Sequence, residues 1–209
     1  MRKRMNTPAV CAWWGLIMDI STAGSLDKNF ILDLYQEAFP EQERKPFSLI
    51  ERKAAMGEME MLLIREEKKR IGFAIVAYGE RLVLLDYFAI SPRWRGQGYG
   101  SAALELIQGL YSDRPLFLEI EKPLTADTES SDGQAGGMDP EEKEGASDIR
   151  QRRKAFYLRN GMLETGVQVE LFGVKMELLS TVPGLTFEDC EPLYRSLLGP
   201  IYRNLIKQI

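Results

Sequence analysis

A glycine-rich turn between a strand-like and a helix-like segment constrains this chain more than any other feature. Residues 84–110, LLDYFAISPRWRGQGYGSAALELIQGL, show a buried strand, a short basic turn, three closely spaced glycines and an amphipathic helix. The glycines allow positive φ angles and a close approach of the backbone to a ligand. Their N–H groups can converge at the positive end of the following helix, with Arg93 and Arg95 beside them. The segment therefore predicts a site for a phosphate-bearing ligand.

The composition limits the possible partners, the compartment and the acid–base groups of this chain. The 209 residues, 44% of them apolar, are enough for one globular domain with its own core. A net charge of −4 argues against a nucleic-acid partner. Cys11 and Cys190 give neither a disulfide framework nor a metal-binding spacing, so we expect no metal and a reducing, cytoplasmic compartment. The chain has no histidine, which leaves acid–base chemistry to carboxylates, tyrosine, lysine, cysteine or water.

We place the folded domain at residues 21–180. Three segments, two beside it and one within it, are expected not to belong to its packed core. Residues 1–20 begin basic and then apolar, as a signal peptide does, and secretion is the alternative interpretation. The apolar run is too short for a membrane span and lacks a clear cleavage site, so we predict a flexible extension and no membrane association. Residues 122–148, rich in Ser, Gly, Asp and Glu, predict a disordered acidic loop. Residues 181–209 predict a helical tail that packs on the domain or on a second copy, as in a homodimer.

Hydrophobic periodicity predicts an α/β chain with a definite order of elements. Two helices, at residues 26–39 and 48–57, precede an antiparallel meander of three strands at 59–65, 71–78 and 82–90. The glycine turn, a helix over 100–111, a strand at 115–120, a helix over 149–160 and a hairpin at 167–179 follow. We expect these elements to form a central, mostly antiparallel but mixed and splayed sheet that is flanked by helices.

Two classes of phosphate ligand fit a strand, a glycine turn and a helix. Residues 96–101, GQGYGS, partly satisfy the dinucleotide signature G-x-G-x-x-G/A, and Glu119 or Glu121 follows about twenty residues later, where a ribose-binding acid would lie. In dinucleotide folds, however, the turn follows its strand almost at once, whereas SPRWR intervenes here. The strand also belongs to a meander. We therefore favour the second class, coenzyme A.

The turn and its flanks resemble the GNAT superfamily of acyl-CoA-dependent N-acetyltransferases. Residues 95–100, RGQGYG, match its R/Q-x-x-G-x-G/A signature. Residues 89–92, AISP, look like the strand end before its turn, and residues 155–162, AFYLRNGM, look like its F-Y-x-x-x-G-F segment. The order of elements agrees over residues 26–179. The chain departs from the family in having Arg150 and Lys154 where Asn and a small residue are usual, and Met162 where Phe is usual.

This resemblance implies an acetyl-CoA-dependent enzyme and assigns roles to particular residues. The strand through Ile90 would splay from its neighbour near Leu116, pantetheine would fill the gap, and the Ile90 N–H would polarise the thioester. Tyr157 would protonate the departing thiolate, because a phenol pKa of about 10 is not far above that of a thiol. Main-chain N–H groups of the turn would hold the pyrophosphate. The implied cofactor-binding residues are Phe88, Ala89, Ile90, Arg95, Gly96, Gln97, Gly98, Tyr99, Gly100 and Ser101.

A carboxylate is the expected base. The attacking amine must lose a proton, and without histidine a carboxylate accepts it directly or through water. Glu119 is the first candidate and Asp86 the second. Strand alternation places Glu119 and Glu121 on one face, which suggests a polar cleft, although either could lie at a solvent-facing strand end. The expected acceptor is a primary amine on a small molecule or a peptide, attacked directly in a ternary complex. The alternative function is a non-catalytic acyl-CoA-binding sensor, which needs neither Tyr157 nor a carboxylate.

Overall fold

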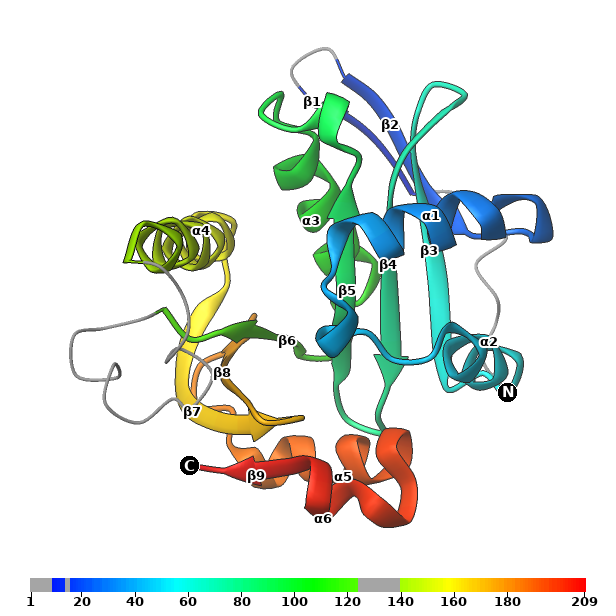
Figure 1. Cartoon of the computed structure of the whole chain (residues 1–209). Helices are drawn as coiled ribbons and strands as arrows, with labels where there is room; N and C mark the ends of the chain where they lie inside the picture. The colour runs from blue at the N-terminus through cyan, green and yellow to red at the C-terminus, as the bar shows by residue number, and fades with distance from the viewer. Residues whose placement is uncertain (1–8, 14–15, 124–139) are drawn as a thin grey trace.

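One mixed sheet organises the part of the chain that the computed structural model describes, residues 9–13, 16–123 and 140–209. In these residues the sheet has nine strands in the order β1-β2-β3-β4-β5-β6-β8-β7-β9 (Figure 1). The strands are β1 (Ala9–Trp13), β2 (Leu16–Thr22), β3 (Met59–Glu66), β4 (Lys69–Tyr78), β5 (Val83–Ile90), β6 (Leu116–Glu121), β7 (Leu163–Leu171), β8 (Val174–Ser180) and β9 (Ile206–Gln208). The helices are α1 (Lys28–Ala38), α2 (Phe47–Ala55), α3 (Tyr99–Leu110), α4 (Pro140–Arg159), α5 (Phe187–Leu198) and α6 (Tyr202–Leu205).

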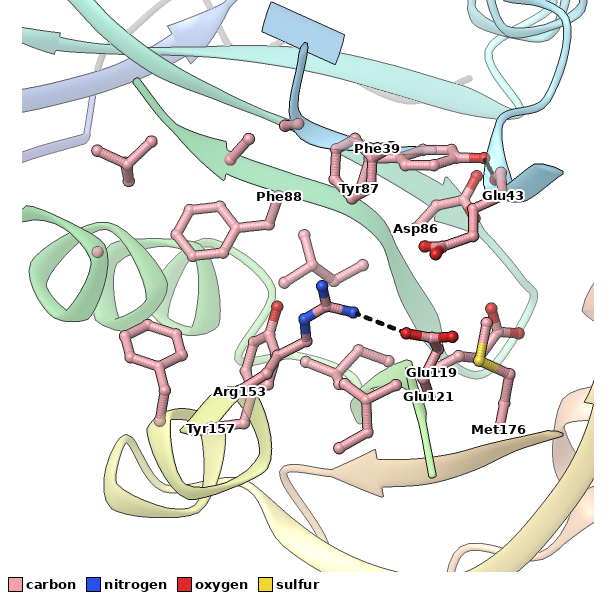
Figure 2. Close-up of a pocket in the computed structure, with 18 of the residues that line it drawn as sticks. Phe39, Glu43, Asp86, Tyr87, Phe88, Glu119, Glu121, Arg153, Tyr157 and Met176 are labelled. Atoms are coloured by element: carbon pink, nitrogen blue, oxygen red, sulfur yellow. Dashed lines mark hydrogen bonds and ion pairs between the residues drawn. The ribbon is translucent and has the colours of Figure 1, made fainter. Parts of the chain in front are cut away.

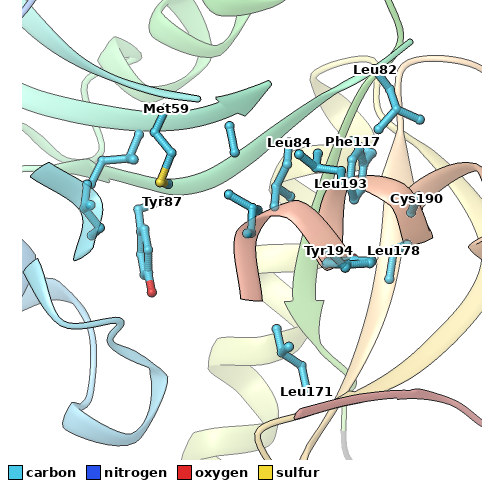
Figure 3. Close-up of a cluster of buried hydrophobic side chains, with 14 of the residues drawn as sticks. Met59, Leu82, Leu84, Tyr87, Phe117, Leu171, Leu178, Cys190, Leu193 and Tyr194 are labelled. Atoms are coloured by element: carbon cyan, nitrogen blue, oxygen red, sulfur yellow. The ribbon is translucent and has the colours of Figure 1, made fainter. Parts of the chain in front are cut away.

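Strand alternation divides the apolar side chains between two cores. In β3, Leu63 packs in the core that α1, α2 and α5 cover, whereas Leu62 and Ile64 pack in the core that α3 covers. Figure 3 shows part of the first core, where Leu193 and Tyr194 of α5 lie against the beginnings of β5 and β6. Helix α5 therefore buries the place where β5 and β6 meet.

The expected α/β architecture, a mostly antiparallel sheet flanked by helices, is confirmed. The N-terminal expectation needs correction. Residues 16–20, predicted to be part of a flexible extension, lie in β2, which pairs with β3, and β1 pairs with β2 in turn. The physical reason is burial, because Met18 and Ile20 are 1% and 0% exposed and extend the core beyond β3. The rest of that extension, residues 1–8 and 14–15, lies outside the described residues.

The internal loop and the C-terminal tail also differ from expectation. Residues 140–148 were predicted to belong to a disordered loop, but they form the first part of α4, which begins at Pro140. Residues 124–139 lie outside the described residues. The tail begins as the expected helix, but this helix ends at Leu198, and the tail finishes in a strand, β9, which pairs with β7. Ile206 is 3% exposed there, so the strand buries an apolar side chain and covers the edge of β7. Among the helices that the structure describes, none has the length and apolar run needed to cross a bilayer.

The neighbouring strands β5 and β6 run parallel but pair only at their beginnings. Val83 is opposite Leu116 and Leu84 is opposite Phe117, after which the strands diverge. β5 nevertheless stays paired with β4 as far as Ile90, and β6 stays paired with β8. The register of β4 and β5 shifts so that Asp86 has no opposite residue, and such a bulge bends a strand. The splay expected near Leu116 is therefore present, and both strands turn unpaired backbone groups toward the gap.

Gly72 permits the close approach of β4 to the end of β5. A Cβ at this position would lie 2.5 Å from the Ala89 carbonyl oxygen and 2.8 Å from Cδ1 of Ile90. We expect Gly72→Ala to lower the free energy of unfolding, measured in urea, by about 1–3 kcal/mol, because the strands must move apart. The control is Gly109→Ala in α3, where a Cβ meets nothing within 4 Å; it should raise stability by about 0.5–1 kcal/mol. Unchanged stability of Gly72→Ala would contradict this account of the β4–β5 contact.

Candidate active site

A cavity of about 620 Å³ opens where β5 and β6 diverge (Figure 2). Residues 85–90 of β5 form one wall and residues 118–121 of β6 form the other. The glycine turn and α4 close one end, while the loop between α1 and α2 and the β7–β8 hairpin line the other end. The cavity therefore joins the predicted phosphate site to the predicted carboxylates.

The glycine turn has the backbone shape that its sequence predicts. Gly96 has a φ of 73° and Gly98, the N-cap of α3, has a φ of 88°. Within the described part of the chain, the main-chain N–H groups of residues 96–101 donate to no main-chain acceptor. Unsatisfied N–H groups at the first turn of a helix, together with its dipole, form an anion site. The Arg95 N–H is an exception among the expected donors, because it already donates to the Pro92 carbonyl at 3.1 Å.

Not every predicted cofactor-binding side chain faces the cavity. Gln97 is exposed and donates through Nε2 to the Arg93 carbonyl at 2.8 Å. Tyr99 is 5% exposed and packs edge-on against Trp94, with ring centroids 5.2 Å apart. Both side chains shape the turn, so only their main-chain groups remain for a ligand. The eight other predicted residues line the cavity: Phe88, Ala89, Ile90, Arg95, Gly96, Gly98, Gly100 and Ser101.

The free edge of β5 presents its own donors to the gap. The Ser91 N–H donates to the Ile71 carbonyl on the β4 side at 2.8 Å. Because successive N–H groups of a strand point to opposite edges, the N–H of Ile90 points the other way, toward the gap, and so does that of Phe88. The Ile90 carbonyl accepts a hydrogen bond from Nε of Arg95 at 2.7 Å. This bond ties the glycine turn to the end of β5 and places the two sets of donors side by side.

At the other end of the cavity, Asp86 forms a buried ion pair. The Lys45 Nζ lies 2.6 Å from Oδ1 of Asp86, and the two side chains are 9% and 2% exposed. Burial opposes the charge on Lys45, but the carboxylates of Asp86 and Glu119 outweigh it and raise the pKa of Lys45. Asp86, the second candidate base, therefore serves as the partner of a buried cation.

Glu119 forms no ion pair within the described residues. Its Oε1 is buried and has no hydrogen-bond partner in the described part of the chain. Burial raises the pKa of Glu119 to about 7; the positive charge of Lys45 and the nearby Tyr194 hydroxyl oppose the rise, and Asp86 adds to it. Glu121, by contrast, accepts bonds from Arg150 at 2.8 and 3.2 Å and lies 3.9 Å from Arg153. The two glutamates line one cavity, as strand alternation predicted.

Tyr157 reaches the cavity from α4. Figure 2 shows it beside Arg153, pointing from α4 toward β5. Burial raises the pKa of Tyr157 to about 12, and the positive charge of Arg153 opposes this rise. Because its pKa is raised, the Tyr157 hydroxyl stays protonated at neutral pH and can donate a hydrogen bond.

The helix that carries Tyr157 ends as expected at Gly161. The φ of 85° at Gly161 allows the Met162 N–H to bond back to the Tyr157 carbonyl at 3.1 Å.

Several residues of this site were not identified from the sequence. Lys45 and Glu43 come from the loop FPEQERKPF, which gave no sign of a contact with Asp86, 41 positions further along the chain. Arg150, noted only as a departure from the family pattern, and Arg153 contact Glu121. Their signal was a run of basic residues just before the tyrosine segment. Within the described residues, no three Cys, Asp or Glu side chains gather as a metal site would require.

Part of the chain matches the model of a known protein family. Residues 28–126 match the model of the acetyltransferase (GNAT) family. No curated protein sequence matches the chain closely enough to count as a relative. The matched segment runs from α1 to the residues after β6 and so includes the glycine turn, both walls of the gap and Glu119.

Solved structures show the same fold. A protein from Bacteroides thetaiotaomicron that is assigned to the GNAT family aligns with a TM-score of 0.62 and 21% identity, over 88% of this chain and 97% of that chain. The spermidine N-acetyltransferase of Vibrio cholerae, in complex with CoA and spermine, aligns with a TM-score of 0.54 and 12% identity, over 78% and 94%. An aminoglycoside 6'-N-acetyltransferase complexed with coenzyme A aligns with a TM-score of 0.54 and 17% identity, over 80% and 99%.

The raised pKa of Glu119 predicts a pH-dependent cost to stability. The folded state binds this proton more tightly than the unfolded chain, so stability falls as the pH rises from 4.5, the ordinary pKa, to about 7. Above that range, Glu119→Gln should be more stable than the parent by about 3 kcal/mol in urea unfolding, with no difference near the ordinary pKa. Glu105→Gln, at an exposed site of α3, should change little at any pH. A constant difference for Glu119→Gln across this range would contradict the assignment.

Proposed function

Because the chain carries a GNAT acetyltransferase domain, we propose that it is an acetyl-CoA-dependent N-acetyltransferase that transfers an acetyl group to a primary amine. One observation carries the proposal. A single gap between β5 and β6 has unsatisfied main-chain donors at one end and, at the other, a buried carboxylate whose pKa is raised to about 7. The first suits a diphosphate ester with an extended arm, and the second suits a base that deprotonates an amine.

The donor would bind mainly to main-chain groups. The pyrophosphate is assigned to the N–H groups of residues 96–101 at the start of α3. The pantetheine arm would lie along the free edge of β5 and take the place of the missing strand partner. The thioester oxygen would then meet the Ile90 N–H, which polarises the carbonyl as an oxyanion-hole donor does.

Substitution of Gly98 tests this placement without any assay of turnover. In Gly98→Glu, a carboxylate would enter the site of the pyrophosphate, so the increase in melting temperature that CoA gives the parent should be lost. Gly57→Glu is a matched control: both glycines have positive φ, 88° and 74°, and a Cβ at either meets nothing within 4 Å. Gly57→Glu should lose as much stability in the absence of CoA as Gly98→Glu does, but CoA should still raise its melting temperature. A full CoA response in Gly98→Glu would overturn the assignment.

The reaction is a direct acyl transfer in a ternary complex. Glu119 takes a proton from the acceptor ammonium, directly or through water, and the freed amine attacks the thioester carbon. A C–N bond forms, the C–S bond breaks, and the electron pair leaves on the CoA sulfur. The pKa of Tyr157, about 12, is further above that of a thiol than an ordinary phenol would be. Its first contribution is therefore a hydrogen bond to the developing thiolate, which leaves the enzyme as the thiol after proton transfer.

Kinetics on two variants test these roles. For the parent, kcat/KM should rise with pH through about 7, because Glu119 must be ionised to act. Glu119→Gln should lower kcat by about 10²-fold or more and remove this rise, and Tyr157→Phe should lower kcat similarly while KM for acetyl-CoA stays the same. Glu105→Gln and Tyr202→Phe, outside the cavity, are the controls.

The same assay separates the enzyme from a sensor. Release of free thiol from acetyl-CoA is followed against a panel of primary amines for the parent and both variants. Turnover that both substitutions reduce supports the enzyme. Tight CoA binding with no turnover on any amine, and no effect of Tyr157→Phe, would favour a non-catalytic acyl-CoA-binding module instead.

A further inference from the structure

A second cavity, of about 420 Å³, adjoins the first. It lies between the beginning of α2, the tip of the β7–β8 hairpin and the residues that follow α5. Gln42, Lys45 and Phe172 line both cavities. The two spaces therefore meet at the end of the first cavity that holds the carboxylates, away from the glycine turn.

The second cavity is basic and apolar, in contrast to the acidic end of the first. Of the lining residues that the structure describes, none is acidic and four are cationic: Arg44, Lys45, Arg52 and Lys53. The apolar part of its lining consists mainly of Pro46, Leu49, Leu197, Leu198, Pro200 and Leu205. Among the described residues of the first cavity, four carboxylates outnumber three cations; the carboxylates are those of Glu43, Asp86, Glu119 and Glu121, and the cations are Lys45, Arg95 and Arg153. Adjoining spaces of opposite sign fit a molecule that carries both charges, separated by hydrocarbon.

Within the described residues, two cations of the second cavity form no ion pair; Arg52 is exposed to solvent, whereas Arg44 is partly buried. Its Nε is buried without a hydrogen bond, and within the described residues its guanidinium forms no ion pair. Lys45 is paired with Asp86, and Lys53 binds Glu58 at 2.5 Å and the Ser196 carbonyl at 2.9 Å. A partly buried guanidinium without a partner is costly, and a carboxylate, which can accept two parallel hydrogen bonds, would satisfy it.

The wall between the cavities is a single extended segment. Arg44 has a φ of −89° and a ψ of 125°, so the side chains on either side of it point the opposite way from its own. Glu43 and Lys45 accordingly line the first cavity, and Arg44 lines the second. The backbone of this segment is therefore what separates Glu43 in the first cavity from Arg44 in the second.

Phe172 provides an apolar surface common to both cavities. It stands at the tip of the β7–β8 hairpin with a φ of 50°, followed by Gly173 with a φ of 82°. Left-handed φ is unfavourable for a bulky residue and is found where the surroundings impose it. Here the Phe172 N–H donates to the Leu205 carbonyl at 2.8 Å, which ties the hairpin tip to the C-terminal segment. The strained turn holds an aromatic ring where the hydrocarbon part of a ligand would cross.

We propose that the second cavity is an anchoring subsite for the acceptor, and that the acceptor is an amine whose hydrocarbon chain ends in a carboxylate. The carboxylate pairs with Arg44, the chain passes Phe172, and the amine reaches Glu119 in the first cavity. This inference rests on the proposed function, since it names the acceptor class of the same site. It favours a zwitterionic amino carboxylate over a diamine, whose second cation would meet Arg44.

Acceptors matched in length test the inference. KM is measured with acetyl-CoA for ω-amino acids of graded chain length, for alkylamines of the same lengths and for the corresponding diamines. The ω-amino acids should have the lowest KM at their best length. Arg44→Gln should raise their KM by about 10- to 100-fold and leave KM for the alkylamines unchanged. Arg44→Lys keeps the positive charge but cannot donate two parallel hydrogen bonds, so its KM for the ω-amino acids should lie between those of the parent and Arg44→Gln. The control Arg81→Gln, at an exposed turn, should have the same KM as the parent.

A binding measurement separates this inference from the proposed function. The thermal shift produced by the best ω-amino acid is recorded without acetyl-CoA, for the parent and for Arg44→Gln. If no amine is acetylated but the ω-amino acid stabilises only the parent, the enzymatic proposal fails and the subsite stands. If alkylamines are acetylated but amino acids bind no better, if diamines bind best, or if Arg44→Gln changes KM equally for every acceptor, the subsite proposal is overturned and the enzyme stands.

Discussion

The interrupted pairing of β5 with β6 is the constraint on which the rest of the site depends. The strands share two residue pairs and then separate, so each keeps one edge of backbone donors and acceptors without a strand partner. Unpaired backbone groups away from water are costly, and an extended ligand arm can satisfy them. The separation also makes room for the cavity itself. Helix α5 packs on the paired beginnings of both strands, which keeps the junction closed at that end while the other end stays open.

Charge compensation gives different properties to the carboxylates around the gap. Asp86 is paired with Lys45, and Glu121 is paired with Arg150 and Arg153, so both hold structural elements together. Among the described residues, Glu119 combines a buried Oε1 that accepts no hydrogen bond with a pKa raised to about 7. Neighbouring acidic residues in one low-dielectric space cannot all remain charged without compensation, so burial of a carboxylate that has no ion pair moves its pKa toward neutrality.

Much of the fold could be predicted from local pattern. The meander of β3, β4 and β5, the glycine turn, α3 and β6 follow from apolar alternation, tight turns and the position of glycines. Two errors share one cause. Residues 16–20 and the chain end at β9 look unremarkable locally, and they become strands because an existing sheet edge offers backbone partners and a place to bury Met18 and Ile20, or Ile206. A strand added at an edge is decided by its partner more than by its own propensity.

The sequence by itself determined the backbone shape of the glycine turn and the position of the tyrosine near the end of α4, because both depend on residue type within a few neighbouring positions. Positive φ at Gly96 and Gly98, and a tyrosine one turn before the Gly161 helix end, need no distant partner. Only the tertiary structure decided which carboxylate is free to act and what adjoins it. Those properties depend on Lys45, Arg44 and Arg150, which come from other elements, and Coulomb interactions act through space with no record in sequence order.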